Sequence, residues 1–137
     1  MNISQVMSHD VKIASPEDTL QHAAQLMKDI DAGVLPVGEN DRLVGMLTDR
    51  DIAIRAVAEG KGPNSQVREV MSHEIKYVYD DDSLEDAAKQ MGTLQMRRLP
   101  VLNREKRLVG IVSLGDVALK KKSSAGDALK DVSRHSA

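Results

Sequence analysis

The sequence predicts an α+β fold of two similar halves, each ordered β-α-β-β-α, with small sheets packed with helices about a pseudo-twofold axis. The first observation is an internal repeat, because the segment Val6–His9 recurs at Val70–His73. The second is that helical and strand-like apolar spacings alternate in the same order in both copies. The third is size: 137 residues, 41% of them apolar, suffice for a core without disulfides, and the chain has no cysteine.

The repeat covers most of the chain. Leu35–Val37 matches Leu99–Val101, and after one inserted residue Arg42–Gly45 matches Arg107–Gly110. Two copies of this length are too few and too long for a solenoid, which favours a pair of equivalent halves. We therefore expect repeat 1 at 1–62, a linker at 63–69, repeat 2 at 70–122 and a flexible polar tail at 123–137.

The first half begins with a short extended piece at Val11–Ala14, and Ser15–Thr19 then supplies helix caps. A helix follows because apolar residues recur at helical spacing. They are Leu20, Ala23, Ala24, Met27 and Ile30. The polar turn Glu39–Arg42 joins two short apolar runs into a hairpin. A second helix starts at Asp49 and ends at Gly60–Pro63, where glycine and proline stop helices.

The second half repeats this order. A strand is expected at 76–79 and a helix from Ser83. A hairpin over 99–112 and a helix from Leu114 complete the copy. Each half therefore has the same five predicted elements.

Composition excludes several classes of protein. A net charge of −2 and only two aromatic residues, Tyr77 and Tyr79, are not the footprint of a nucleic-acid binder. No apolar run approaches the roughly 18 residues that a membrane helix needs. The N-terminal sequence also lacks the basic and apolar regions of a signal peptide. We expect a cytoplasmic protein that binds neither nucleic acid nor membrane.

The sequence offers no catalytic set. None of the four histidines has the spacing of a metal pair on a helix face, and there is no thiol nucleophile. Gly60–Gly62 lacks the spacing of a phosphate-binding loop. Asp80–Asp82 could hold a hard cation, although a solvated turn before a helix is favoured. We expect no enzyme, no catalytic cofactor and no metal site.

A strand-to-helix turn of the form Gly-apolar-apolar-[Thr/Ser]-x-x-Asp occurs in both copies. It contains Thr48 with Asp51, and Ser113 with Asp116. As structure, each pair forms a capping box, and the spacing alone favours this. As a binding site, the helix N-terminus can seat an anion and the carboxylate can accept two hydrogen bonds from a ribose. The two roles are compatible.

Two adjacent arginines, Arg97 and Arg98, precede the second Leu-Pro-Val, where the first copy has Gly33–Val34. A solvated surface pair and a phosphate site are equally consistent with this position. The second interpretation rests on the fork-shaped guanidinium groups, which suit phosphate oxygens.

These features together resemble the CBS domain, named after cystathionine β-synthase, in its tandem form, the Bateman module. The resemblance covers about 6–58 and 70–120. Its parts are the initial Val-Met-Ser, Leu-x-x-Ala-Ala-x-x-Met on the first helix, Leu-Pro-Val, and Arg-Leu-Val-Gly followed by [Thr/Ser]-x-x-Asp. Each part is weak alone, but the whole order occurring twice is specific. Since no catalytic domain is attached, the resemblance implies a stand-alone module.

The resemblance implies clefts between the halves that bind adenosine compounds: AMP, ADP, ATP, NAD or S-adenosylmethionine. In the family the motif's Asp holds the ribose beside the Thr or Ser, which assigns this role to Asp51 with Thr48 and to Asp116 with Ser113. Arg97 and Arg98 align with the basic positions that contact phosphates in nucleotide-sensing relatives. The base would pack against Ile13, Ala14 and Val34 in one copy, and Tyr77, Val78 and Arg98 in the other.

The first copy departs from this pattern. Gly33–Val34 replaces the arginines, and the carboxylate of Asp49 would repel a phosphate unless Arg50 compensates. We therefore expect the two clefts to be unequal, with one good site.

The resemblance implies a regulatory module that senses an adenosine nucleotide and signals the bound state to an unknown protein partner. Bare modules of the family pair through their helices, so we expect a homodimer, with the helix around Ala53–Val57 as the subunit contact. Two alternatives stay open: a structural or protein-interaction module with degenerate sites, and a Mg²⁺ sensor.

Overall fold

The computed structural model describes residues 1–120 and has the predicted mixture of helices and small sheets. The expected tail at 123–137 lies outside the described residues. The chain forms two compact units. The α1 unit is Lys12–Ile75, and the α3 unit combines Met1–Val11 with the chain from Lys76 onward. These units do not coincide with the sequence repeats, because the opening segment of each repeat packs in the unit that holds the other repeat's hairpin.

The α1 unit contains a helix, a hairpin and a second helical segment. Its elements are α1 (Leu20–Ile30), β1 (Val34–Glu39), β2 (Arg42–Thr48) and α2 (Asp49–Asp51). The predicted cap of α1 is confirmed, because Thr19 Oγ1 accepts the backbone N–H of His22 at 3.1 Å. From α2 the chain continues helically through 52–59 and ends at Gly60, whose φ of 79° is left-handed as a helix-stop glycine requires.

The predicted opening strand of the first half is reduced to a single bridge. Only Ala14 pairs, in parallel with Val37 of β1. Its N–H donates to the carbonyl of Pro36 at 3.0 Å, and its carbonyl accepts the N–H of Gly38 at 2.9 Å. Pairing stops there, because Pro16 has no N–H and the chain turns into the cap of α1.

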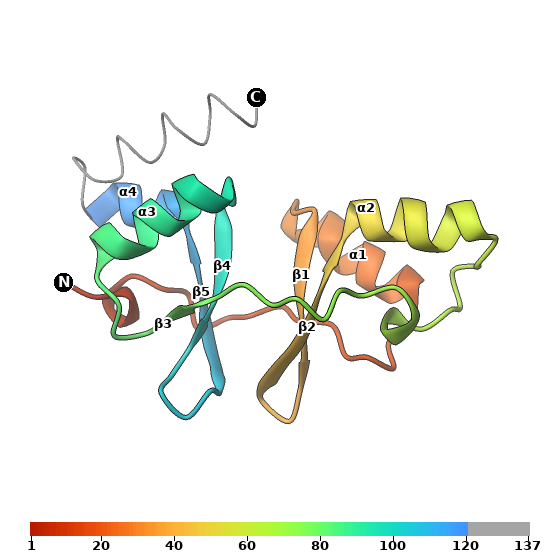
Figure 1. The fold of residues 1–137 in the computed structure, drawn as a ribbon, viewed down its shortest axis with the longest axis horizontal. Coiled ribbons are helices and arrows are strands. Elements are labelled where there is room, and N and C mark those ends of the chain that lie inside the picture. Colours follow the sequence, from red (N-terminus) through yellow and green to blue (C-terminus); the bar gives the residue numbers. More distant parts are fainter. Residues whose placement is uncertain (121–137) are drawn as a thin grey trace. The chain divides into compact units, whose positions relative to one another are not determined.

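The α3 unit has all five predicted elements of the second half. They are β3 (Val78–Tyr79), α3 (Leu84–Leu94), β4 (Arg98–Leu102), β5 (Leu108–Ser113) and α4 (Leu114–Lys120). The sheet order is β3-β4-β5, with β3 parallel and β5 antiparallel to β4. Ser83 caps α3 by accepting the N–H of Asp86 at 3.1 Å. In Figure 1, α3 and α4 lie at the end of β4 and β5 that is opposite their connecting turn.

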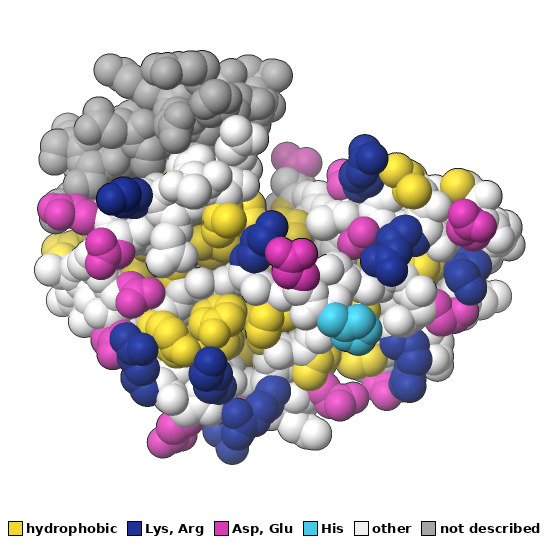
Figure 2. Space-filling view, viewed as in Figure 1, with side chains coloured by type: hydrophobic (Ala, Val, Ile, Leu, Met, Phe, Trp, Pro, Cys, Tyr) yellow, Lys and Arg dark blue, Asp and Glu magenta, His cyan; other side chains and the backbone are white. Residues whose placement is uncertain are grey.

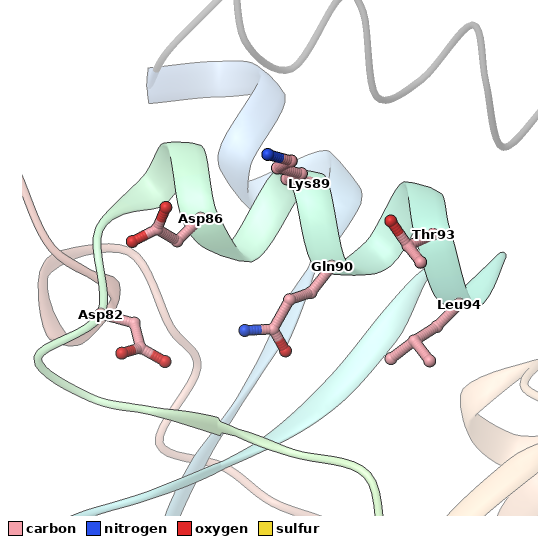
Figure 3. Close-up of a pocket in the computed structure, with 6 residues that line it drawn as sticks. All are labelled: Asp82, Asp86, Lys89, Gln90, Thr93 and Leu94. Atoms are coloured by element: carbon pink, nitrogen blue, oxygen red, sulfur yellow. The ribbon is translucent and has the colours of Figure 1, made fainter.

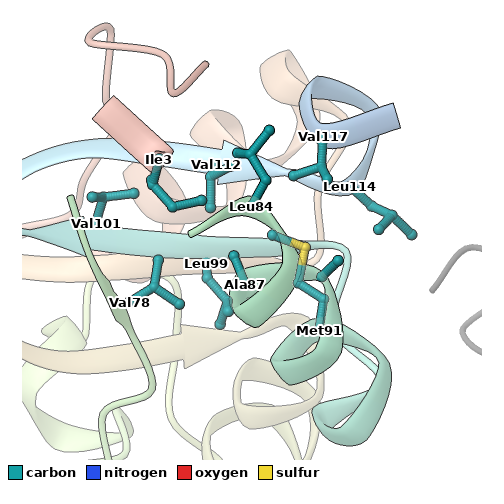
Figure 4. Close-up of a cluster of buried hydrophobic side chains, with 11 residues drawn as sticks. Ile3, Val78, Leu84, Ala87, Met91, Leu99, Val101, Val112, Leu114 and Val117 are labelled. Atoms are coloured by element: carbon teal, nitrogen blue, oxygen red, sulfur yellow. The ribbon is translucent and has the colours of Figure 1, made fainter. Parts of the chain in front are cut away.

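The core of the α3 unit includes a residue from the N-terminal end of the sequence. Side chains of the sheet, α3 and α4 form one buried cluster (Figure 4). Ile3, at 0% exposure, belongs to this cluster although it precedes the rest by more than 70 residues of sequence. Its segment is fixed by backbone bonds, since the N–H of Ile3 donates to the carbonyl of Asp82 at 3.0 Å. The first residues are therefore part of this unit's core.

The repeated Val-Met-Ser segments each dock on a glycine of a hairpin. Ser8 exchanges two backbone hydrogen bonds with Ile111, at 2.8 and 2.9 Å. Beside this bridge, a Cβ on Gly110 would lie 2.7 Å from the sulfur of Met7. In the α1 unit Ser72 bridges Met46 in the same way. The two repeated motifs thus make equivalent contacts, one within each unit.

The surface carries mixed charge. On the face shown in Figure 2, Lys and Arg side chains are interspersed with Asp and Glu side chains. Among residues 1–120 there is no helix with the length and apolar character needed to cross a bilayer.

Candidate functional site

The two strand-to-helix turns that carry the repeated motif have the same geometry. Thr48 Oγ1 accepts the N–H of Asp51 at 3.0 Å, and the N–H of Thr48 donates to Asp51 Oδ2 at 3.0 Å. Ser113 and Asp116 make the same two bonds, both at 3.0 Å. The capping interpretation is therefore confirmed in both copies.

The cap leaves part of each carboxylate available. Within residues 1–120, Oδ1 of Asp51 and Oδ1 of Asp116 accept no hydrogen bond. Both side chains are half-buried. A carboxylate has about four lone-pair sites, so the cap occupies a minority of them. Each turn can therefore hold a diol while it caps the helix.

The hairpins place residues 33–34 and 97–98 alongside these turns. Arg98 pairs with Ser113 in the β4–β5 register, as Val34 pairs with Thr48. The N–H of Leu114 donates to the carbonyl of Arg97 at 2.8 Å. The structure thus brings both arginines to the backbone of the second motif.

The electrostatic surroundings of the two turns differ. In the α3 unit, Arg97 is exposed and Arg98 half-buried, and neither makes an ion pair inside the described range 1–120. In the α1 unit, Asp49 and Arg50 are both exposed, and Asp49 Oδ1 accepts the N–H of Arg50 at 2.8 Å. One turn is bordered by cations and the other by an additional carboxylate.

The residues predicted to contact a base are buried to different degrees. Ala14 is 0% exposed and Val78 is 1% exposed, so both side chains belong to the cores. Ile13 is 36% exposed and Tyr77 half-buried. A bound base could reach the side chains of Ile13 and Tyr77 but only the backbone of the other two. These binding roles stay predictions.

Sequence reasoning missed a cluster around the two tyrosines. The rings of Tyr77 and Tyr79 meet edge to face with centroids 5.5 Å apart. The guanidinium of Arg104 lies 4.0 Å from the centroid of Tyr79, and Lys106 Nζ donates to Tyr77 Oη at 3.2 Å. Lys106 lowers the pKa of Tyr79, with a smaller contribution from Tyr77. The signal in the sequence was indirect: Arg104 and Lys106 lie in the turn of the predicted hairpin, and the two tyrosines lie in the strand expected to pair with it.

The acidic run Asp80–Asp82 lies in the turn before α3, where the favoured interpretation places it, and its carboxylates make hydrogen bonds there. Asp81 accepts two hydrogen bonds from Arg104 Nε, at 2.9 and 3.1 Å, and one from Nη2 at 2.8 Å. This contact lowers the pKa of Asp81. Asp82 Oδ2 accepts the N–H of Tyr79 at 2.9 Å. Over residues 1–120, no three His, Asp or Glu side chains gather as metal ligands.

A shallow depression of about 400 Å³ lies on the outer side of α3 (Figure 3). Five of its six lining residues have polar or charged side chains. The residues are Asp82, Asp86, Lys89, Gln90, Thr93 and Leu94. None of the predicted site residues lines it, and Lys89 is its single cation. The depression therefore gives no support to a nucleotide site at this place.

An apolar groove of about 280 Å³ lies between α1 and the helical segment after α2. It is lined by Leu20, Gln21, Ala24, Ile52, Ala56, Val57, Lys61, Gly62 and Pro63. In the segment where a subunit contact was predicted, Ile54 is 46% and Val57 68% exposed, whereas Ala56 is buried. The homodimer stays a prediction.

The chain is similar to known proteins over most of its length. A family model described as the CBS domain matches residues 3–57 and 67–123. CBS domain-containing protein YhcV of Bacillus subtilis is 46% identical over 134 residues, covering 96% of this chain and 95% of that protein. A crystal structure of Hypoxic Response Protein I with two coordinated zinc ions has a TM-score of 0.76 at 39% identity, covering 88% of this chain and 98% of that one. A crystal structure of CBSX2 in complex with AMP has a TM-score of 0.73 at 27% identity, with coverage of 88% and 98%.

Proposed function

Because this chain belongs to the CBS-domain family and contains two CBS domains in tandem, we propose that it is a regulatory module that binds an adenosine nucleotide and signals the bound state to a protein partner. The observation that carries the proposal is the turn at Ser113–Asp116, where a carboxylate with an unused oxygen lies beside two arginines without ion-pair partners in residues 1–120. The AMP complex of CBSX2, a similar chain, supports the choice of ligand class.

Each group in the proposed site has a chemical role. Asp116 accepts hydrogen bonds from the ribose hydroxyls while Ser113 keeps the carboxylate in place. Arg97 and Arg98 bind phosphate oxygens through their guanidinium forks. Thr48 with Asp51 offers the same ribose contact in the other unit.

The proposed role is regulatory rather than catalytic. A ligand shifts a conformational equilibrium only by its difference in affinity for the two states. The signal therefore depends on nucleotide binding one conformation of the module more tightly, and the partner reads the population of that conformation.

The test is a thermal melt followed by circular dichroism, since the chain has no Trp to report unfolding. AMP, ADP, ATP, NAD, S-adenosylmethionine and Mg²⁺ are added one at a time after any co-purified ligand has been removed. A ligand at 100 times its Kd stabilises the folded state by about 2.7 kcal/mol. For a chain of this size we expect Tm to rise by roughly 10 °C.

The outcomes separate the candidate functions. A shift of this size with one adenosine compound supports the proposal and identifies the sensed ligand. No shift with any nucleotide at millimolar concentration overturns it and favours an interaction module. A shift with Mg²⁺ alone overturns it in favour of a cation sensor.

A further inference from the structure

We propose that the two turns distinguish ligands by charge, and that Asp49 with Gly33 makes the α1-unit turn specific for adenosine compounds that carry no phosphate. The inference rests on the proposed function and deepens it. It assigns phosphorylated ligands to the turn beside Arg97 and Arg98, and nonphosphorylated ones to the turn of Thr48 and Asp51.

The carboxylate of Asp49 is held directly over Gly33. A Cβ added to Gly33 would lie 2.7 Å from Asp49 Oδ2 and 3.0 Å from its Cγ. The N–H of Asp49 donates to the carbonyl of Gly33 at 2.9 Å, and its Oδ1 accepts the N–H of Arg50 at 2.8 Å. Gly33 directly precedes Val34, which pairs with Thr48. The negative charge is therefore fixed beside the proposed ribose contact.

The same backbone geometry in the α3 unit carries the opposite charge. Leu114 takes the place of Asp49, and its N–H donates to the carbonyl of Arg97 at 2.8 Å. The Leu114 side chain is 3% exposed and packs in the core, so it leaves the turn to the arginines. Asp116 is the one acid of the turn Ser113–Asp116, and Arg97 and Arg98 are joined to this turn through the backbone.

Gly33 and Asp49 depend on each other. Because a Cβ at position 33 would collide with the Asp49 carboxylate, an arginine cannot be placed there while Asp49 keeps its position. An arginine introduced at position 33 alone would therefore have to displace the Asp49 carboxylate and would still lie beside its negative charge. Two changes, Gly33→Arg with Asp49→Leu, would rebuild the pair found in the other unit.

Electrostatics sets the size of the discrimination. AMP carries about two negative charges at neutral pH, whereas adenosine carries none. Charges of like sign a few ångströms apart repel by an amount that corresponds to about tenfold or more in affinity, even with strong solvent screening. The repulsion acts on AMP and leaves adenosine unaffected.

The test measures one turn at a time by isothermal titration calorimetry. Asp116→Ala removes the ribose carboxylate of the α3 unit, and Asp116→Ser is a second background in case the first does not fold. In either background adenosine should bind at least about fivefold more tightly than AMP. Adding Asp49→Asn should raise AMP affinity on the order of tenfold and leave adenosine affinity within about twofold.

Asp41→Asn is the matched control. It removes the same charge from the hairpin turn, about 17 Å along the strands from the Val34–Thr48 pair. Asn accepts the left-handed φ of 63° found at this position. This control should leave the ratio of AMP to adenosine affinity unchanged.

Each outcome decides between the two proposals. Equal affinities for AMP and adenosine that Asp49→Asn does not change overturn the charge selection and leave the proposed function standing. Binding of AMP to the wild type, with no adenosine binding in either background, also overturns the inference alone. If the wild type binds neither compound, the inference is wrong, and the melts with ADP, ATP, NAD and S-adenosylmethionine decide the proposed function.

Discussion

At the scale of single residues, Asp51 and Asp116 combine a structural role with a proposed binding role. Asp51→Ala should lower the free energy of unfolding by only about 1 kcal/mol, the usual cost of a lost cap. It should weaken ligand binding at the α1-unit turn by about 10- to 100-fold, because hydrogen bonds to a charged group are lost. Denaturant unfolding and calorimetry in the Asp116→Ala background measure the two effects separately.

Ser83→Ala is the control for this prediction. It removes a cap of the same kind from α3, where Ser83 Oγ accepts the N–H of Asp86. The loss of stability should be similar and ligand affinity should not change. An equal loss of affinity in both variants would show that Asp51 acts only through folding.

The pair formed by Asp81 and Arg104 predicts a pH dependence. Hydrogen bonding from Arg104 lowers the pKa of Asp81 below its ordinary value of 3.8. A lowered carboxyl pKa stabilises the folded state above the unfolded pKa, and this stability is lost as the pH falls through the folded pKa. The difference in Tm between wild type and Arg104→Gln should therefore stay constant above about pH 5 and shrink below about pH 4.

Melts from pH 7 to pH 2.5 measure this difference. A gap that widens on acidification would contradict the assignment. Both side chains are solvent-exposed, so the effect is expected to be small and to decrease with added salt.

At the scale of elements, the docking of the Val-Met-Ser segments on hairpin glycines gives a further prediction. Gly110→Ala places a Cβ 2.7 Å from the Met7 sulfur and 2.8 Å from the Ser8 carbonyl oxygen. Such overpacking should destabilise the α3 unit by about 1–3 kcal/mol. Denaturant unfolding followed by circular dichroism measures this loss.

Gly115→Ala provides the comparison, because its Cβ would meet only Ser113 Oγ, at 3.7 Å. Since Gly115 lies in α4, this change should be neutral or stabilise the protein by up to about 1 kcal/mol. Equal losses in the two variants would mean that the segment is not held against the glycine.

The elements that could be predicted are those specified by local sequence. Thr19 and Ser83 cap α1 and α3 where helix-starting residues precede apolar helical spacing. Both hairpins follow from apolar runs around a polar turn. The predicted strand at Val11–Ala14 was too long. A strand needs a partner over several residues, and in this segment only Ala14 has one. The tyrosine cluster depends on side-chain contacts between separate elements, which periodicity does not report.

At the scale of the whole molecule, Ile3 joins the first residues to a core whose other buried side chains lie between Val78 and Val117. Ile3→Ala should cost about 2–5 kcal/mol, because the side chain is 0% exposed. In hydrogen exchange, protection should fall in β3 to α4 and be retained across Lys12–Ile75.

Ile54→Ala is the matched substitution at a surface isoleucine, 46% exposed, and should cost less than about 1 kcal/mol. A loss of protection in the α1 unit with Ile3→Ala would show that the two units do not unfold separately. The residue ranges of the two units could not be predicted from the repeat. The repeat shows which segments are similar to each other, but not which segments are in contact.

The placement of residues 1–11 affects how the chain folds during translation. The α1 unit is continuous in sequence, so it is synthesised in full before β3 to α4 are made. The bridge from Ser8 must wait for Ile111, about 100 residues later. At about 5 to 20 residues per second, this leaves the first segment without its partner for roughly 5 to 20 s. During that interval Ile3 and Met7, once outside the ribosome, are apolar side chains open to chaperones, and the α1 unit has all of its own residues before their partners are complete.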